Sequence, residues 1–161
     1  MVLLIESIIG IVLFTIAVVP MVIKNPIAYI GDYPPAIRKR CEELGLIEKD
    51  KPKFAKNHLI KKGFALIFFV IVFSLVINKI NGADTFLKGF VDSYILWLVI
   101  DWYDALILDC LWFCHSKKIR IPDTEDMKEY KDYLFHIKQS FVGMLLGLPA
   151  CILVGLLVMI F

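Results

Sequence analysis

Four long runs of apolar residues, separated by shorter polar segments, organise the chain. They cover Val2–Ile23, Gly63–Ile80, Gly89–Cys114 and Phe141–Phe161. A helix needs about 20 apolar residues to cross the hydrocarbon of a bilayer, with a lower limit of about 17, and each run meets this requirement. Because lipid offers no hydrogen bonds to an exposed backbone, such runs must be helical. The pattern predicts an all-α, polytopic integral membrane protein in which four transmembrane helices form one bundle and a single domain, residues 1–161.

Basic residues predict the orientation of these helices. The chain has 18 Lys and Arg residues, most of them in the loops 24–62 and 115–140, whereas only Lys79 and Lys88 lie between the second and third runs. Cytoplasmic loops of membrane proteins are enriched in Lys and Arg. We therefore expect both loops to be cytoplasmic and both termini to lie outside the cytoplasmic or plasma membrane. The basic loops should face anionic lipid headgroups, so the predicted partners are membrane lipids and not nucleic acid.

Composition and motifs exclude several other classes of protein. Hydrophobic residues make up 59% of the chain and the mean hydropathy is +0.74, whereas about half is usual in soluble domains. The sequence contains no GxGxxG, P-loop, HExxH, GxSxG or CxxC motif. Dinucleotide binding, nucleotide hydrolysis, zincin, serine hydrolase and thioredoxin-like chemistry are therefore excluded at motif level, and the cofactor is unknown from the sequence.

The first cytoplasmic loop contains signals for two helix starts. Pro34-Pro35 favours a short helix that ends before Gly45, with three residues recurring on one face: Ile37, Cys41 and Leu44. This helix either lies in the headgroup plane or packs as a cap on the bundle. Asp50-Lys51-Pro52 predicts that the second long helix begins near Lys53, and the polar segment 78–82 predicts the turn after it.

The second cytoplasmic loop predicts an extension of the last transmembrane helix. Asp123 or Thr124 can cap a helix, and no helix-breaking residue follows before Phe141. We therefore expect one helix from about Thr124 to the C-terminus, with its first turns in the cytoplasm. Small residues at every fourth position of this helix, Gly143, Gly147, Cys151 and Gly155, predict a close helix contact. The predicted partner is a second copy of the chain through Gly143, Gly147 and Gly155, with helix one or two of the same chain as the alternative.

Acidic residues within the third run are the strongest functional signal. Asp101 lies near the middle of this run and Asp104 follows one turn later. A carboxylate at the bilayer centre costs about 2.5–3.5 kcal/mol on insertion scales, so it needs a partner or a function. The two residues lie about 60° apart around an α-helix, where carboxylates favour a shared proton or a small hard cation. We predict a proton or cation site at Asp101 and Asp104.

An α-helical third run also predicts which side chains surround that site. Seven residues form a seam that should face protein: Tyr94, Trp97, Asp101, Asp104, Leu108, Leu111 and His115. Trp97, Trp102 and Tyr103 are expected to line the acid site. Asp109 should lie about 80° from Asp101, on the other side.

A second group of reactive side chains gathers at the cytoplasmic end. Asp109 and His115 end the third run, and His136 precedes the fourth. These three residues could supply general acid–base catalysis, because histidine titrates near neutral pH. Cys114, His115 and His136 are also candidate ligands of a transition metal, although their spacing matches no zinc-finger pattern. His58 precedes the second run in the same way as His136 precedes the fourth.

Three functions follow from these patterns. The first is a homo-oligomeric membrane protein that binds, conducts or couples the transport of a proton or small cation through Asp101 and Asp104. The second is a membrane-embedded enzyme that acts on a lipid or isoprenoid-like substrate at the cytoplasmic face. The third is a partner subunit whose intramembrane acids pair with basic residues of a larger membrane complex.

Overall fold

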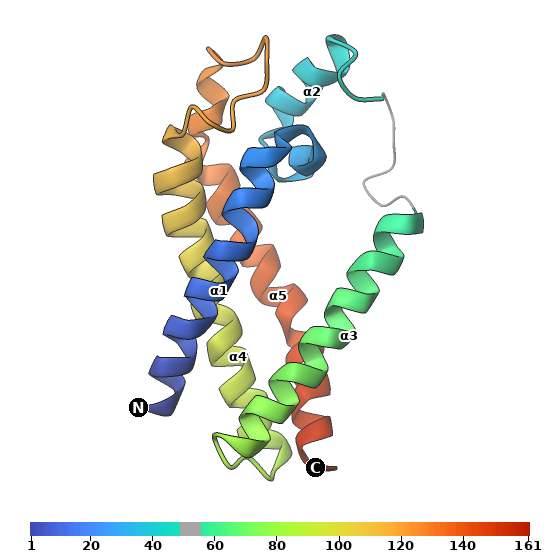
Figure 1. Cartoon of the computed structure of the whole chain (residues 1–161), viewed down its shortest axis with the longest axis vertical. Coiled ribbons are helices and arrows are strands. Elements are labelled where there is room, and N and C mark those ends of the chain that lie inside the picture. The colour runs from blue at the N-terminus through green and yellow to red at the C-terminus, as the bar shows by residue number, and fades with distance from the viewer. Residues whose placement is uncertain (49–55) are drawn as a thin grey trace.

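The computed structural model describes residues 1–48 and 56–161, with the side chains of 1–48 and 66–161. Every regular element in this part of the chain is helical, which confirms the predicted all-α class. Four long helices are α1 (Val2–Lys24), α3 (Lys56–Lys79), α4 (Phe86–Tyr103) and α5 (Tyr133–Val158). They run along the long axis of the molecule, and α3 diverges from the others toward one end (Figure 1). The predicted start of the second helix near Lys53 lies outside the described residues.

Two of these helices, α1 and α5, are long and apolar enough to cross a membrane. Only 6% of the most apolar stretch of α1 and 33% of that of α5 is buried inside the protein. A core helix of a soluble protein would bury most of such a stretch. The outward-facing apolar side chains therefore support a membrane location.

Small residues of α5 pack against α4 of the same chain. A Cβ atom added at Gly147 would overlap the indole ring of Trp97, and one added at Gly155 would lie 2.9 Å from the carbonyl oxygen of Phe86. Gly89 of α4 in turn packs against Val158. The predicted close contact is present, but its partner is α4, which belongs to the third apolar run, rather than the helix of the first or second run. Helix α4 occupies this face at Gly147 and Gly155, which are buried, whereas Gly143 is half-buried. A homo-oligomer through these glycines stays a prediction.

The loops form a folded cap at one end of the long helices (Figure 1). It contains the 3₁₀-helices η1 (Pro26–Asp32) and η4 (Lys128–Lys131) and the short helix α2 (Pro35–Glu43). Ile37 and Cys41 on α2 are fully buried in an apolar cluster with Val22, Tyr33, Phe113, Ile119, Ile121 and Tyr130. The short helix is therefore confirmed, and its apolar face packs on the protein instead of lying in the headgroup plane. Burial, with a smaller effect of the neighbouring Glu42, raises the pKa of the Cys41 thiol.

The predicted start of the last helix is wrong by nine residues, because α5 begins at Tyr133 and not near Thr124. Thr124 does not cap a helix. Its hydroxyl donates to the carbonyl oxygen of Ile121 over 2.8 Å and lies 2.7 Å from the hydroxyl of Tyr130. Asp132 is the N-cap instead, and its carboxylate accepts from the backbone N–H of Phe135 at 3.0 Å. Helix α5 therefore extends only about two turns beyond the apolar run.

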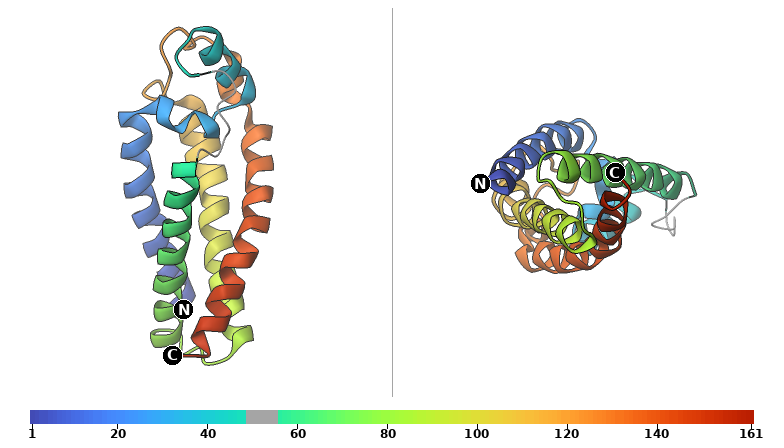
Figure 2. Two further views of the ribbon diagram at one scale, coloured as in Figure 1. Left: turned by 90° about the vertical axis from the view of Figure 1, so that its right-hand side faces the viewer. Right: turned by 90° about the horizontal axis from the view of Figure 1, so that it is seen from below.

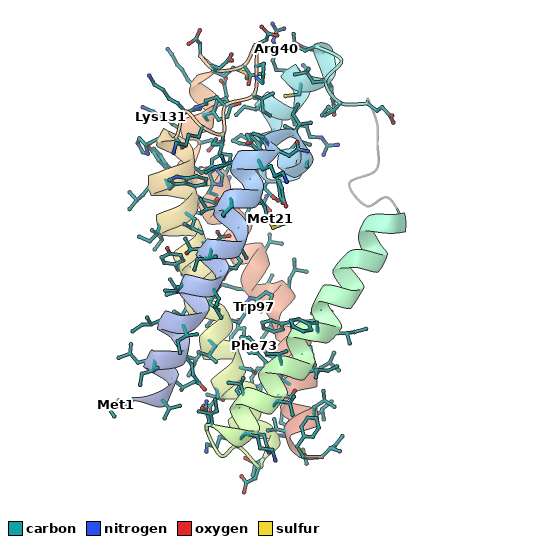
Figure 3. All side chains as sticks on the ribbon, viewed as in Figure 1. Met1, Met21, Arg40, Phe73, Trp97 and Lys131 are labelled. Atoms are coloured by element: carbon teal, nitrogen blue, oxygen red, sulfur yellow. The ribbon has the colours of Figure 1, made fainter. Side chains whose placement is uncertain are left out.

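The two termini and the described residues of the basic loops lie at opposite ends of the molecule. Both termini are at the end away from α2 (Figure 1). Arg40 and Lys131 lie at the capped end, and Met1 lies at the other (Figure 3). The turn that joins α3 to α4 also lies at the end with the termini, and its Gly82 adopts a φ of +61, as the predicted turn requires. The described parts of the two basic loops thus lie at one end of the bundle.

Candidate functional site: an acidic pocket at the capped end

Helix α4 continues without a break into a π-helix, η2 (Asp104–Trp112), and then into the 3₁₀-turn η3 (Phe113–His115). The backbone at the junction is helical, with φ −63 and ψ −44 at Tyr103. A π-helix pairs each residue with the fifth one along instead of the fourth, and such segments occur frequently at functional sites. The helical span of the third run was predictable from its apolar pattern, but this change of pairing was not.

The π-helix changes which side chains share a face. Asp104 and Asp109 are five residues apart, so they follow one another along one side of η2. An α-helix would have turned Asp109 away. Beyond Asp104, the predicted seam of buried residues is therefore only partly correct. Leu108 is buried as expected, whereas Leu111 is 62% exposed and His115 is exposed.

Both acids of η2 line one pocket at the capped end. Its volume is about 180 Å³. The walls come from α1, η1, η2, η3 and α5. The lining residues are Val18, Val22, Tyr29, Gly31, Asp32, Tyr33, Asp104, Leu108, Asp109, Trp112, Phe113, His136 and Gln139. No lysine or arginine lines the pocket among the residues that the structure describes.

An aspartate–histidine pair closes one side of this pocket. The carboxylate oxygen Oδ2 of Asp109 lies 3.1 Å from Nδ1 of His136. The imidazole is 2% exposed and packs edge-on against the rings of Phe113 and Phe135. Its second nitrogen, Nε2, is buried and has no hydrogen-bond partner among the described residues. An aspartate bound to one ring nitrogen fixes the tautomer and orientation of the imidazole, so that the other nitrogen can accept or donate a proton in acid–base chemistry.

Asp104 is the acid of the pocket that lacks a donor. It is half-buried, and it has no hydrogen-bond or ion-pair partner among the described residues. A carboxylate shielded from water without a donor is destabilised, because ionised groups lose more hydration energy than neutral ones. The site therefore suits a ligand that carries positive charge or a proton.

Asp101 occupies a different environment from Asp104. Its Oδ2 accepts a hydrogen bond from the hydroxyl of Ser140 at 2.5 Å, and its carboxylate packs over Gly143. Asp101 does not line the acidic pocket. The two acids predicted to form one site thus lie in different surroundings, and Asp101 joins α4 to α5 through Ser140.

The three aromatic residues predicted to line the acid site lie outside the pocket as well. Trp97 donates from Nε1 to the carbonyl oxygen of Gly143 at 3.1 Å, and its ring meets Phe69 edge-on. Trp97 and Phe73 lie near each other between α4 and α3 (Figure 3). Trp102 packs edge-on against Phe141, and the hydroxyl of Tyr103 lies 3.0 Å from that of Thr15.

The candidate metal ligands do not gather. His115 is exposed and its Nε2 lies 3.1 Å from the hydroxyl of Tyr133, while Cys114 is fully buried. His136 turns instead to Asp109. Among the described side chains, those of residues 1–48 and 66–161, no group of three His, Cys, Asp or Glu is placed to hold a metal ion. The side chain of His58 lies outside the described residues.

Residues of the first loop complete the pocket, and the sequence interpretation missed them. Tyr33 is buried, and its hydroxyl donates to the carbonyl oxygen of Ile119 at 2.9 Å. Burial, with smaller effects from Tyr130 and Asp32, raises the pKa of the Tyr33 phenol, so it stays protonated as a donor. Tyr29 and Asp32 lie in η1 directly after α1. The signal in the sequence that could have indicated these pocket residues is the cluster of aromatic and acidic residues just after the first apolar run.

Comparisons of this chain with protein-family models, with curated proteins and with solved structures find no match.

Proposed function

We propose that the protein crosses the membrane four times and binds a proton or a small cation in the pocket of Asp104 and Asp109. The observation that carries the ligand class is Asp104, a half-buried carboxylate that has no donor among the described residues and lies one π-turn from a second acid. Hard cations and protons are the ligands that carboxylate, phenol and amide oxygens prefer. The charge of the pocket at the capped end would then depend on the concentration of protons or of that cation.

Four crossings are supported by the shape of the molecule in addition to α1 and α5. The helices α3 and α4 lie beside them along the same axis (Figure 2). Because η2 prolongs α4 with helical backbone, the third element reaches from Phe86 to Trp112, long enough for about 30 Å of hydrocarbon. The described side chains of α3 from Leu66 onward include several exposed apolar groups, as lipid contact requires: Leu66, Ile67, Phe68, Ile71 and Leu75.

The proposed orientation predicts which loops are reached from outside the cell. In a background without the four native cysteines, Asp84→Cys should react with an impermeant maleimide on intact cells, because it is exposed in the turn between α3 and α4. Lys117→Cys, exposed in the basic loop before η4, should react only after permeabilisation. Labelling of Lys117→Cys on intact cells would show that the orientation is wrong.

The cation-binding proposal predicts that ligand binding depends on Asp104. Calorimetric titration of purified protein with Na⁺, K⁺, Mg²⁺ and small organic cations, together with proton uptake on acidification, should detect at least one saturable event. Asp104→Asn should weaken this event about tenfold or more, since it removes the charge and the strongest acceptor while keeping the shape. Asp84→Asn removes one exposed charge at the other end of the bundle and should change nothing. Equal behaviour of Asp104→Asn and the unmodified protein for every cation and for protons would refute the proposal.

A second function is favoured by the contact between Asp109 and His136. A buried imidazole oriented by a carboxylate can act as a general base, and His136 and Asp109 both line the acidic pocket. This supports the alternative of a membrane enzyme that acts on a lipid or isoprenoid-like substrate. His115, the third residue of that hypothesis, is exposed and pairs with Tyr133, so only Asp109 and His136 remain candidates for catalysis.

A further inference from the structure

We infer, on the basis of the proposed cation-binding function, that the ligand of the acidic pocket is a small primary ammonium group. The ammonium group belongs either to a free amine or to the ethanolamine headgroup of a phospholipid. Size, hydrogen-bonding capacity and the apolar walls of the pocket lead to this ligand class.

The size of the pocket suits a ligand of several atoms. Its volume is about 180 Å³, whereas an apolar cavity of about 150 Å³ accommodates benzene. A metal ion would need three or more ligands drawn together within bonding distance. Among the described residues no such group of His, Cys, Asp or Glu exists. The acids are therefore spread around a space that a multi-atom cation fills better than a bare ion.

The hydrogen-bonding capacity of the pocket favours a primary ammonium over a quaternary one. In the part of the chain that the structure describes, Asp104 has no donor, and Gln139 and Tyr29 supply further oxygens. His136, which is only 2% exposed, adds a buried nitrogen that has no partner among those residues. A primary ammonium carries three N–H donors for such acceptors, whereas a quaternary ammonium carries none. Charge-assisted bonds of this kind are the stronger class of hydrogen bond.

The remaining walls suit the carbon atoms of such a ligand. Val18, Val22 and Leu108 supply aliphatic surface, and Trp112 and Phe113 supply aromatic surface. Aromatic rings also attract a cation that lies over their faces. Because Val18 and Val22 belong to the apolar helix α1, the pocket lies where that helix meets the folded cap. An amine headgroup at the membrane surface and a free amine from the aqueous side can both approach this position.

Calorimetric titration of the full chain in detergent tests the ligand class with a matched pair of probes. Ethanolamine should bind saturably, and choline, which differs by three N-methyl groups, should bind about tenfold or more weakly because it lacks N–H donors. Asp104→Asn should weaken ethanolamine binding by a similar factor, whereas Asp84→Asn should leave it within about twofold of the unmodified protein. Thermal unfolding of each variant without ligand shows whether it is folded.

The source of the ammonium group is resolved by repeating the titration in nanodiscs. If the headgroup is the ligand, discs of phosphatidylethanolamine should suppress binding of free ethanolamine, and discs of phosphatidylcholine should not. If neither kind of disc suppresses the binding of free ethanolamine, the ligand is a free amine. Equal affinity for choline and ethanolamine, or no ethanolamine binding, overturns the inference. If Asp104-dependent binding of protons or metal ions persists in that case, the proposed cation site stands without it, whereas loss of every Asp104-dependent event removes both.

Discussion

Gly147→Leu should prevent stable folding of the bundle, and Gly147→Ala should destabilise it measurably. Helix α5 approaches α4 so closely at this position that even a Cβ atom would overlap the indole ring of Trp97. Moving that ring would also break its hydrogen bond to the carbonyl oxygen of Gly143. Overpacking of this kind typically costs about 1–3 kcal/mol, partly offset in Gly147→Ala by about 1 kcal/mol of helix propensity. Thermal unfolding in detergent, followed by circular dichroism, measures the effect.

Gly31→Ala is the matched control for this substitution. Nothing lies within 4 Å of a Cβ atom added at Gly31, so the same chemical change should leave the unfolding temperature nearly unaltered. A second expectation concerns assembly, because the glycine face is already filled by α4. Gly147→Ala should therefore lower stability without a specific loss of oligomer size. An unchanged unfolding temperature together with a smaller particle would mean that this face contacts a second copy after all.

Much of the helical architecture could be predicted from the sequence because lipid and backbone chemistry leave few alternatives. The run Gly89–Cys114 was expected to be helical, and helical backbone extends from Phe86 to His115. The short helix after Pro34 and the turn before Gly82 followed from local proline and glycine signals. In each case the deciding interaction lies within a few residues along the chain.

Features that depend on contacts between distant residues could not be predicted. Thr124 has the side chain of an N-cap, yet its hydroxyl is bound by Ile121 and Tyr130 in the folded cap. The change to π-type pairing at Asp104 has no local marker such as glycine or proline. It nevertheless decides the site, because it turns Asp109 toward Asp104 and His136 and leaves Asp101 with Ser140. The proposed binding site therefore centres on Asp104 and Asp109 and does not include Asp101.

Asp109→Leu should destabilise the protein by about 2–3 kcal/mol, since it leaves the buried imidazole of His136 with neither nitrogen bonded. His136→Phe alone should have a smaller effect, because Asp109 is partly exposed and water can replace the lost partner. The double variant should be more stable than Asp109→Leu, because two apolar side chains leave no unpaired polar group behind. Denaturant or thermal unfolding of the four proteins gives the coupling free energy directly.

His115→Phe is the control for the double-variant rescue, since this histidine is exposed and should contribute less than about 0.5 kcal/mol. Its combination with Asp109→Leu should show no rescue, because His115 contacts Tyr133 and not Asp109. Failure of His136→Phe to rescue Asp109→Leu would mean that the contact of 3.1 Å does not stabilise the fold. The rescued double variant also separates folding from function. It should keep the bundle folded while it weakens cation binding, because one of the two acids on the π-helix has been removed from the pocket.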